Sequence, residues 1–191
     1  MEMVGRKPYM VGHQEFAALY RVQAPMVSQW LSPSRGALDP GTATVVSGVR
    51  YWPLGFACRY GTLTPRQKLL DEGVKARLMA EQGEGWLADL GDELPPMVGQ
   101  HEIIQAFHLP SQGTLATKIA ADGFPRADWF LSGSRLWLLE TVLDAVPELR
   151  ARARSVVWEP DEHVVKALRE GTYDGPGSQV LTRGRHARYP R

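Results

Sequence analysis

Apolar side chains recur with helical spacing in two stretches of similar sequence, residues 13–31 and 101–119. In the first stretch, a break after Tyr20 separates two short apolar periods, and the second period places Val27 and Leu31 four residues apart on one helix face. The other stretch repeats this pattern. Each stretch therefore predicts two short helices joined by a tight turn, which is a helix-turn-helix.

A polar-apolar alternation follows each helix pair, in residues 45–54 and 130–139. Both segments contain Ser-Gly-x-Arg-x-Trp-x-Leu, and the repeat period is about 85–87 residues, longer than the roughly 20–50 residues of solenoid repeats. The Ser-Gly pair supplies the positive φ that a tight hairpin turn requires. Each repeat is thus predicted to be a helix-turn-helix followed by a β-hairpin, a winged helix present twice.

The order helix-turn-helix, Gly-Phe-Pro (residues 123–125), then Ser-Gly-x-Arg-x-Trp-x-Leu resembles the MerR-like and phage-excisionase winged-helix DNA-binding domains. The second repeat is the closer match, because the first has residues 36–40 and an insertion at residues 41–44 in place of Gly-Phe-Pro. The resemblance covers roughly half of the chain. It implies DNA binding by a transcription regulator or a recombination-directionality factor of a phage or mobile element.

The expected fold class is mainly α with short β-hairpin wings, in which a helical segment joins two winged helix-turn-helix domains. The expected segments are an N-terminal arm (1–12), the first domain (13–60), a helical connector (61–97), the second domain (98–147), a helical extension (148–171) and a basic, disordered tail (172–191). The tail is expected to be disordered because it is rich in Gly and Pro and lacks an apolar period.

The connector and the extension carry weaker helix signals. Thr64 and Pro65 are typical of a helix start, and Trp86 belongs to a short apolar group expected to form one more turn. The connector either packs on the first domain, spaces the two domains or dimerises. In the second half, Pro147 is expected to end a closing helix, and a further helix is expected between Pro160 and Gly171.

Composition limits the partners and the cellular compartment expected for the protein. The 191 residues are 43% hydrophobic and carry a net charge of only +1, so any case for nucleic-acid binding must rest on local charge. The single cysteine, Cys58, excludes an intramolecular disulfide and fits a reducing compartment. No apolar run approaches the roughly 18 residues that span a bilayer. We therefore expect a cytoplasmic, nucleoid-associated protein without a membrane partner.

The second helix of each pair is the predicted recognition helix, because such a helix lies in the major groove with its first residues against base edges. Gln29 suits a bidentate contact to adenine, and Met26 and Pro25 suit a thymine methyl group. The predicted DNA-binding residues are Pro25, Met26, Ser28 and Gln29 in the first repeat, and Ser111, Gln112, Thr114, Thr117 and Lys118 in the second. Since the two helix faces differ, the two domains should recognise different DNA sequences, or one should recognise sequence while the other only holds the DNA.

Arginines near the hairpins are further candidates. Arg50 and Arg135 occupy the shared hairpin pattern, and Arg35 and Arg126 precede the hairpins. We expect phosphate or minor-groove contacts from them, because such contacts provide most of the affinity for DNA. The structural alternative is that each hairpin arginine packs its stem over the neighbouring tryptophan, with which it shares a strand face.

Catalysis is not expected. The five histidines form no Cys/His cluster with metal-ligand spacing, and neither a phosphate-binding Gly-rich loop nor a Gly-x-Ser-x-Gly elbow occurs. No metal or cofactor is therefore predicted. The expected function is sequence-specific binding of double-stranded DNA, at a site that need not be an inverted repeat. The alternatives are a plasmid replication, partition or DNA-packaging component and a protein-interaction adaptor. The sequence does not decide whether the chain forms homo-oligomers.

Overall fold

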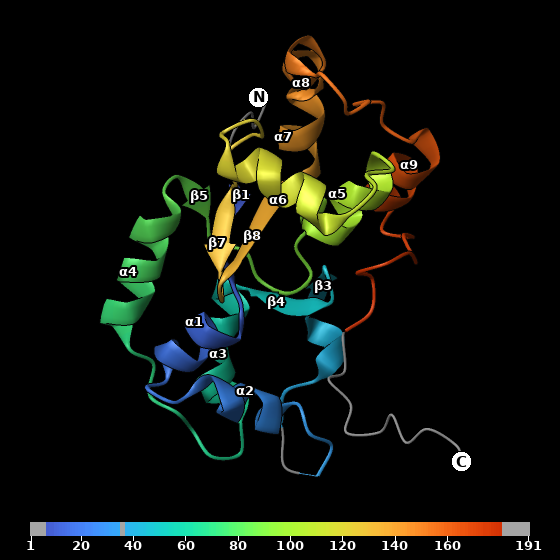
Figure 1. The fold of residues 1–191 in the computed structure, drawn as a ribbon. Helices are drawn as coiled ribbons and strands as arrows, with labels where there is room; N and C mark the ends of the chain where they lie inside the picture. Colours follow the sequence, from blue (N-terminus) through green and yellow to red (C-terminus); the bar gives the residue numbers. More distant parts are fainter. Residues whose placement is uncertain (1–6, 35–36, 181–191) are drawn as a thin grey trace, which may run out of the picture.

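Two units of similar architecture build the molecule, each with a helix pair and a three-stranded antiparallel sheet (Figure 1). The structure, a computed structural model, describes residues 7–34 and 37–180. The first unit consists of β2 (Met10–Val11), α1 (His13–Leu19), α2 (Ala24–Trp30), the 3-10 helix η1 (Pro40–Thr42), β3 (Thr44–Val46), β4 (Val49–Pro53) and α3 (Leu54–Leu63). The second unit consists of β6 (Met97–Val98), α5 (Gln100–Ala106), α6 (Gln112–Ala120), β7 (Trp129–Leu131), β8 (Ser134–Leu138) and α7 (Leu139–Asp144).

The remaining elements extend these units. They are β1 (Lys7–Pro8), α4 (Glu72–Gln82), β5 (Gly85–Trp86), α8 (Val146–Arg152) and α9 (Glu162–Glu170). Each predicted hairpin gains a third strand, with the sheet orders β2-β4-β3 and β6-β8-β7. The chain is therefore a mixed α/β structure rather than a mainly α one.

The turns of the two units match in backbone conformation. Arg21 and His108, which lie between the paired helices, both have positive φ, at 54° and 48°. Ser47 and Ser132 open the hairpin turns with a φ of 48° each, and a glycine of positive φ follows each serine. Two successive residues of positive φ make the tight turn that suits the right-handed twist of paired strands. The predicted Ser-Gly hairpins are thus confirmed.

Strict alternation along the central strands gives each sheet two apolar faces. Trp52 of β4 and Trp137 of β8 point into the cores of their own units, where they pack against the helix pairs. Tyr51 and Leu136, one position earlier, point the other way. A hairpin of an ordinary winged helix would have one face in solvent, whereas these sheets are covered on both.

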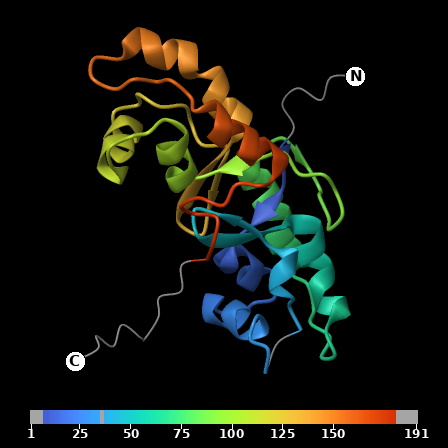
Figure 2. The ribbon, with the colours of Figure 1, turned by 90° about the vertical axis from the view of Figure 1, so that its right-hand side faces the viewer.

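The outer faces of the two sheets pack against each other in an inter-unit core. Its buried members are Met10, Val46, Tyr51, Met97, Trp129, Leu131 and Leu136. Figures 1 and 2 show the result: α5 and α6 lie above the strands, and α1 and α2 lie below them. The tandem units therefore form a sandwich with the sheets inside and the helix pairs outside.

A carboxylate of each unit binds the hairpin turn of the other. Glu15 of α1 accepts hydrogen bonds from the Ser132 backbone N–H at 2.7 Å and from the Ser132 hydroxyl at 2.6 Å. The same hydroxyl oxygen accepts the backbone N–H of Gln14 at 3.1 Å. Glu15 also caps its own helix by accepting the N–H of Gly12. One hairpin tip thus supplies and receives hydrogen bonds at the beginning of α1.

The reciprocal contact has the same pattern. Glu102 of α5 accepts the Ser47 backbone N–H at 2.7 Å and the Ser47 hydroxyl, and this hydroxyl accepts the N–H of His101 at 3.1 Å. Glycine is required beside each tip, because a Cβ on Gly12 would lie 2.3 Å from the Ser132 Oγ, and Gly99 meets Ser47 at the same distance. The two contacts together define a pseudo-two-fold arrangement of the units.

The connector packs on the first unit, but with other boundaries than the sequence predicts. Thr64 ends α3 instead of starting a helix, and α4 begins at Glu72 with Asp71 as its N-cap. Trp86 lies in strand β5, which pairs with β1, and not in a helical turn. Leu78 is buried in the core of the first unit. The apolar pair Leu69 and Leu70 directly before Asp71 extends the helical spacing backward, so the sequence pattern places the helix start too early.

The N-terminal arm is part of the fold where it is described. Met10 and Val11 pair with β4, and the carbonyl of Pro8 accepts the indole N–H of Trp129 at 3.0 Å. Residues 7–12 of the predicted N-terminal arm are therefore part of the fold, because both faces of strand β2 pack against apolar side chains. Residues 1–6 lie outside the described residues.

The C-terminal extension completes the second unit. The closing helix α7 ends at Asp144, as expected before Pro147, and Pro147 itself lies in the first turn of the next helix, α8, in agreement with the preference of proline for that position. Trp158 makes an edge-to-face contact with Phe107 in the core, and α9 ends at Gly171 as predicted. The Gly177 carbonyl accepts the N–H of Gly48, so residues 172–180 are ordered against the first unit. The arginines of the predicted tail, at 183 and beyond, lie outside the described residues.

We predict that Ser132→Ala and Ser47→Ala each lower the free energy of unfolding by about 1.5–3 kcal/mol, because each removes the hydroxyl hydrogen bond to a carboxylate and leaves one helix N–H without its partner. Urea unfolding measures this loss.

Gly12→Ala should destabilise the protein, because the added Cβ overlaps with the Ser132 Oγ, and adding Ser132→Gly should restore part of the stability. Gly113→Ala, which meets only an ordinary contact, is the control. Independent unfolding of the two units would contradict the reciprocal contact.

Acid should loosen α9 from α5 through Asp161. This carboxylate accepts the N–H of Val164 and bonds His108, and these interactions lower its pKa. The stability that a lowered carboxyl pKa contributes is fully present above the unfolded pKa of about 3.9 and is lost as the pH falls through the folded value. Asp161→Asn should therefore lower the Tm at about pH 6, and its difference from the parent protein should be smaller near about pH 3. An equal difference at both pH values would contradict this assignment.

Candidate nucleic-acid interface

Helix α2 presents a polar face to solvent because its apolar residues are fixed in the core. Val27 is fully buried and Trp30 is 6% exposed, whereas Pro25, Ser28 and Gln29 are exposed. Met26 departs from the expectation: it is half-buried and packs against the core of the first unit. Of the residues predicted on this helix, Gln29 is thus the most accessible one able to make directional hydrogen bonds.

Helix α6 presents the corresponding face in the second unit, and Leu115 anchors it. The predicted cap is confirmed, since the Ser111 hydroxyl accepts the N–H of Thr114. Thr117 donates its hydroxyl to the carbonyl of Gly113 at 2.8 Å. The Thr117 hydroxyl therefore donates its proton within the helix, whereas the Ser111 hydroxyl accepts there and can still donate its own proton.

Gln112, at the first turn of α6, contacts a histidine of the preceding helix. Its Nε2 lies 2.7 Å from the Nε2 of His101. Both residues line a cavity of about 200 Å³ together with Arg135 of β8 and Ser47 of the opposite hairpin. The structure thus brings Gln112 and Arg135 together, two of the predicted site residues that lie far apart in the sequence.

The hairpin tips do not take the place that a winged helix offers to DNA. Ser47 and Ser132 bind Glu102 and Glu15 of the opposite units. The arginines beyond the tips remain accessible: Arg50 is half-exposed and Arg135 is exposed. The guanidinium of Arg135 lies 5.8 Å from the Phe130 ring centroid, so it covers this phenylalanine and not the neighbouring tryptophan.

The remaining predicted arginines lie elsewhere. Arg50 is close to His13, whose pKa is lowered by burial and further by this guanidinium. Arg126 is exposed and lies near Lys7, whose pKa is lowered by burial, with Arg126 as a further cause. Arg35 lies outside the described residues. The arginines near the hairpins therefore do not form one cluster.

Charge is distributed unevenly over the helices. Neither α2 nor α6 contains an acidic residue, whereas α4 and α9 carry several. Elsewhere, ion pairs to carboxylates engage Arg21, Arg59, Arg77, Arg150, Arg152 and Arg169. Within the described part of the chain, Arg50, Lys118, Arg126 and Arg135 make no such pair. These four predicted cations thus remain available to an anionic partner.

Sequence reasoning missed two cations beside α2. Arg66 and Lys68 line a cavity of about 530 Å³ together with Met26 and Gln29. They were missed because residues 64–68 were expected to lie in a helix, and only the fold brings this loop to α2. A signal was present in the cluster of basic residues around Pro65, but the spacing alone could not place it.

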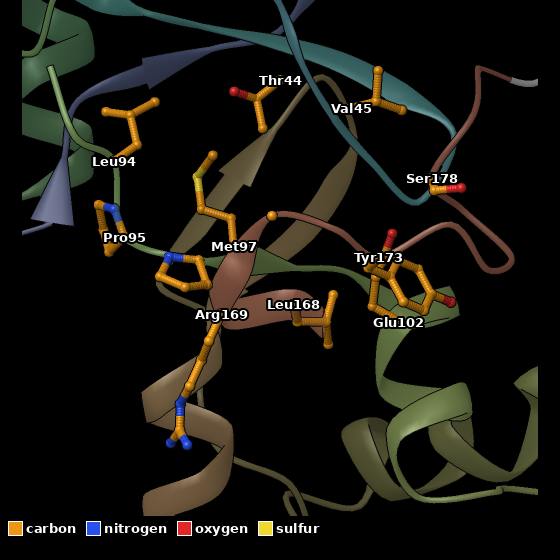
Figure 3. Close-up of a pocket in the computed structure, with 12 residues that line it drawn as sticks. Thr44, Val45, Leu94, Pro95, Met97, Glu102, Leu168, Arg169, Tyr173 and Ser178 are labelled. Atoms are coloured by element: carbon orange, nitrogen blue, oxygen red, sulfur yellow. The ribbon is translucent and has the colours of Figure 1, made fainter. Parts of the chain in front are cut away.

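Another cavity, at the contact between the units, lacks the features of a reactive or anion-binding site. It measures about 450 Å³, and Leu94, Met97, Leu168 and Tyr173 are among the residues that line it (Figure 3). The oxygens of Glu102 are already hydrogen-bonded there. Figure 3 shows the guanidinium of Arg169 pointing away from the other labelled residues, and it pairs with Glu140.

Two further features bear on the class of protein. Burial raises the pKa of the Cys58 thiol to about 11, so this cysteine is protonated at neutral pH and is not an activated nucleophile. The described residues hold no group of three or more His, Cys, Asp or Glu side chains placed to bind a metal ion. None of the helices in residues 7–34 and 37–180 is long and apolar enough to cross a bilayer.

No protein-family model matches this chain, and neither a curated protein nor a solved structure matches it. The function is therefore inferred from the geometry of the two exposed helices and their neighbouring cations.

Proposed function

We propose that this protein binds double-stranded DNA through the exposed faces of α2 and α6, as two winged helix-turn-helix units in one chain. One observation carries the proposal: both second helices are free of acids, expose polar side chains and lie beside cations without carboxylate partners. The near-neutral total charge does not oppose this reading, because no acidic residue lies on either of these two helices.

The chemistry of the two faces suits base reading at the major groove. A helix fits that groove, and Gln29 on α2 and Gln112 on α6 each carry an amide that can bind adenine in a bidentate manner. Gln112 must first leave His101, which costs one hydrogen bond. The rest of the two faces differs, so the half-sites should differ in sequence.

The hairpins have a different role from that of an ordinary wing. Their tips hold the opposite unit, and the phosphate contacts fall to side chains on the flanks, namely Arg50 and Arg135, together with Lys118 and Arg126. A hairpin held at its tip is rigid, so its arginine is positioned before binding and loses less conformational freedom on contact.

The relation between the units determines how two half-sites would be oriented. Each unit contacts the other with the same residues, Glu15 with Ser132 and Glu102 with Ser47, which is the pattern of a two-fold interface. Two helices related in this way meet one duplex in opposite directions. We therefore expect inverted half-sites at a single spacing, because the inter-unit core leaves no flexible joint. This refines the sequence-based view, which left direct repeats open.

The biological role proposed is that of a transcription regulator or a recombination-directionality factor. Both roles need a protein that recognises one DNA site and holds it in a fixed geometry. The two-headed single chain supplies this without dimerisation, so its affinity for DNA should not depend on assembly of subunits.

Selection of bound fragments from randomised double-stranded DNA tests the proposal. We expect a motif with two unlike half-sites in inverted orientation at one spacing. Direct or variably spaced half-sites would contradict the geometric argument, while leaving DNA binding intact. Absence of any salt-sensitive binding to duplex DNA would contradict the function itself and would favour a protein-interaction adaptor.

We predict that Gln29→Ala reduces discrimination at particular base pairs by about 1–3 kcal/mol, because a bidentate amide contact is lost. Competition binding against single-base variants of the selected site measures this. Gln14→Ala, which removes an exposed glutamine from α1, is the matched control and should leave the preference unchanged. An unchanged preference in the Gln29→Ala protein would exclude α2 as a base-reading helix.

A further inference from the structure

The first unit carries a cavity beside α2 that combines an aromatic floor with a basic rim. Trp30 and Tyr60 form the floor, with ring centroids 5.1 Å apart, and both rings are almost fully buried. Arg66 and Lys68 come from the loop after α3, and Gln29 comes from α2. Every charged side chain that lines this cavity is therefore positive.

The loop that carries the two cations is held in place. The backbone N–H of Lys68 donates to the carbonyl of Gly61 at 3.0 Å, and the buried Thr64 hydroxyl donates to the carbonyl of Arg66 at 2.6 Å. The approach to Gly61 is close: a Cβ there would lie 2.5 Å from the Lys68 carbonyl oxygen. The Lys68 ammonium lies 5.2 Å from the Trp30 ring centroid. Its position is thus set before any ligand arrives.

Neither cation has a carboxylate partner among the described residues, although ion pairs are common elsewhere on the surface. Arg66 is exposed, and Lys68 is half-buried with its charge over the indole face. A cation without a carboxylate partner next to a base-reading helix is the arrangement that binds a DNA phosphate.

The second unit lacks this feature at the corresponding place. The region after α6 and between α7 and α8 also encloses a cavity, of about 220 Å³, but Asp122 and Glu148 line it. Its one basic residue, Arg152, is paired with Glu148 at 2.5 Å. The two units therefore share a frame but differ in charge beside their second helices, and the second cavity would repel a phosphate.

We infer that Arg66 and Lys68 form a phosphate-binding site for the DNA backbone next to the half-site that α2 contacts, and that the second unit has no equivalent. This inference rests on the proposed function. The first unit would then bind DNA more tightly than the second. Two contacts to DNA phosphates support α2, whereas α6 depends on its own exposed residues and on Arg135.

Salt titration of DNA binding tests the site, with the duplex recovered by selection as the probe. Each phosphate contact contributes about 0.9 to the slope of log affinity against log salt. Arg66→Ala and Lys68→Ala should each reduce the slope by about one and weaken binding roughly five- to tenfold at about 0.1 M salt. The double variant should lose about two units of slope, and sequence preference should not change.

Matched controls separate charge from folding. Arg77→Ala removes a paired cation on α4, and Arg152→Ala removes the paired cation of the second cavity; both should leave the slope unchanged. Lys68→Arg should retain it. Urea unfolding of each variant shows whether Lys68 acts only by covering Trp30, in which case stability falls and the slope does not, and the inference is wrong.

Neutral methylphosphonate substitution in the probe locates the contact. Replacing phosphates beside the α2 half-site should weaken the parent protein and not the double variant, and replacement beside the other half-site should affect both alike. If the parent protein binds no duplex, the proposed function is wrong. If it binds with a slope that the double variant shares, only the inference about Arg66 and Lys68 is wrong.

Discussion

The architecture depends on a carboxylate that caps its own helix and binds the hairpin of the other unit. Glu15 and Glu102 accept the N–H groups of the N-cap residues of α1 and α5, and at the same time they hold Ser132 and Ser47. A buried carboxylate is stable only when its oxygens are hydrogen-bonded, and Glu102 is 2% exposed. The helix start and the docking of the opposite hairpin are therefore coupled, and neither is complete without the other.

This coupling explains why the hairpins are apolar on both faces. The outer face of each sheet carries Tyr51 or Leu136 because it covers the other sheet, and the inner face carries a tryptophan because it covers the helix pair. Two short sheets that are each only marginally stable alone gain a shared core in this way. The consequence is that the shared core holds the two helix pairs in one fixed relation.

The two units share a backbone fold but differ in the residues that they expose. The backbone of the two units matches even at the strained positions, such as Arg21 and His108. The surfaces differ, because α3 runs on into a basic loop while α7 leads into α8 with Glu148. Duplicated units keep the residues that hold them together, whereas residues outside the shared contacts are free to diverge. Under the proposed function, unequal half-sites are the expected result.

The sequence alone determined the local elements that repeat. The two helix pairs, the Ser-Gly hairpins and the Ser111 cap follow from short-range spacing and turn chemistry, and the structure has them where they were predicted. Each of these features depends on residues a few positions apart, for which periodicity and capping rules are sufficient.

Only the tertiary structure decided how the units meet and which cations lie beside each helix. The contact of Glu15 with Ser132 joins residues 117 positions apart, and no local pattern predicts it. The same holds for Lys68, which is brought to Trp30 by a loop that local rules assigned to a helix. Long-range packing selects among local conformations of similar free energy. The spacing of residues along the chain therefore does not predict which surfaces pack together.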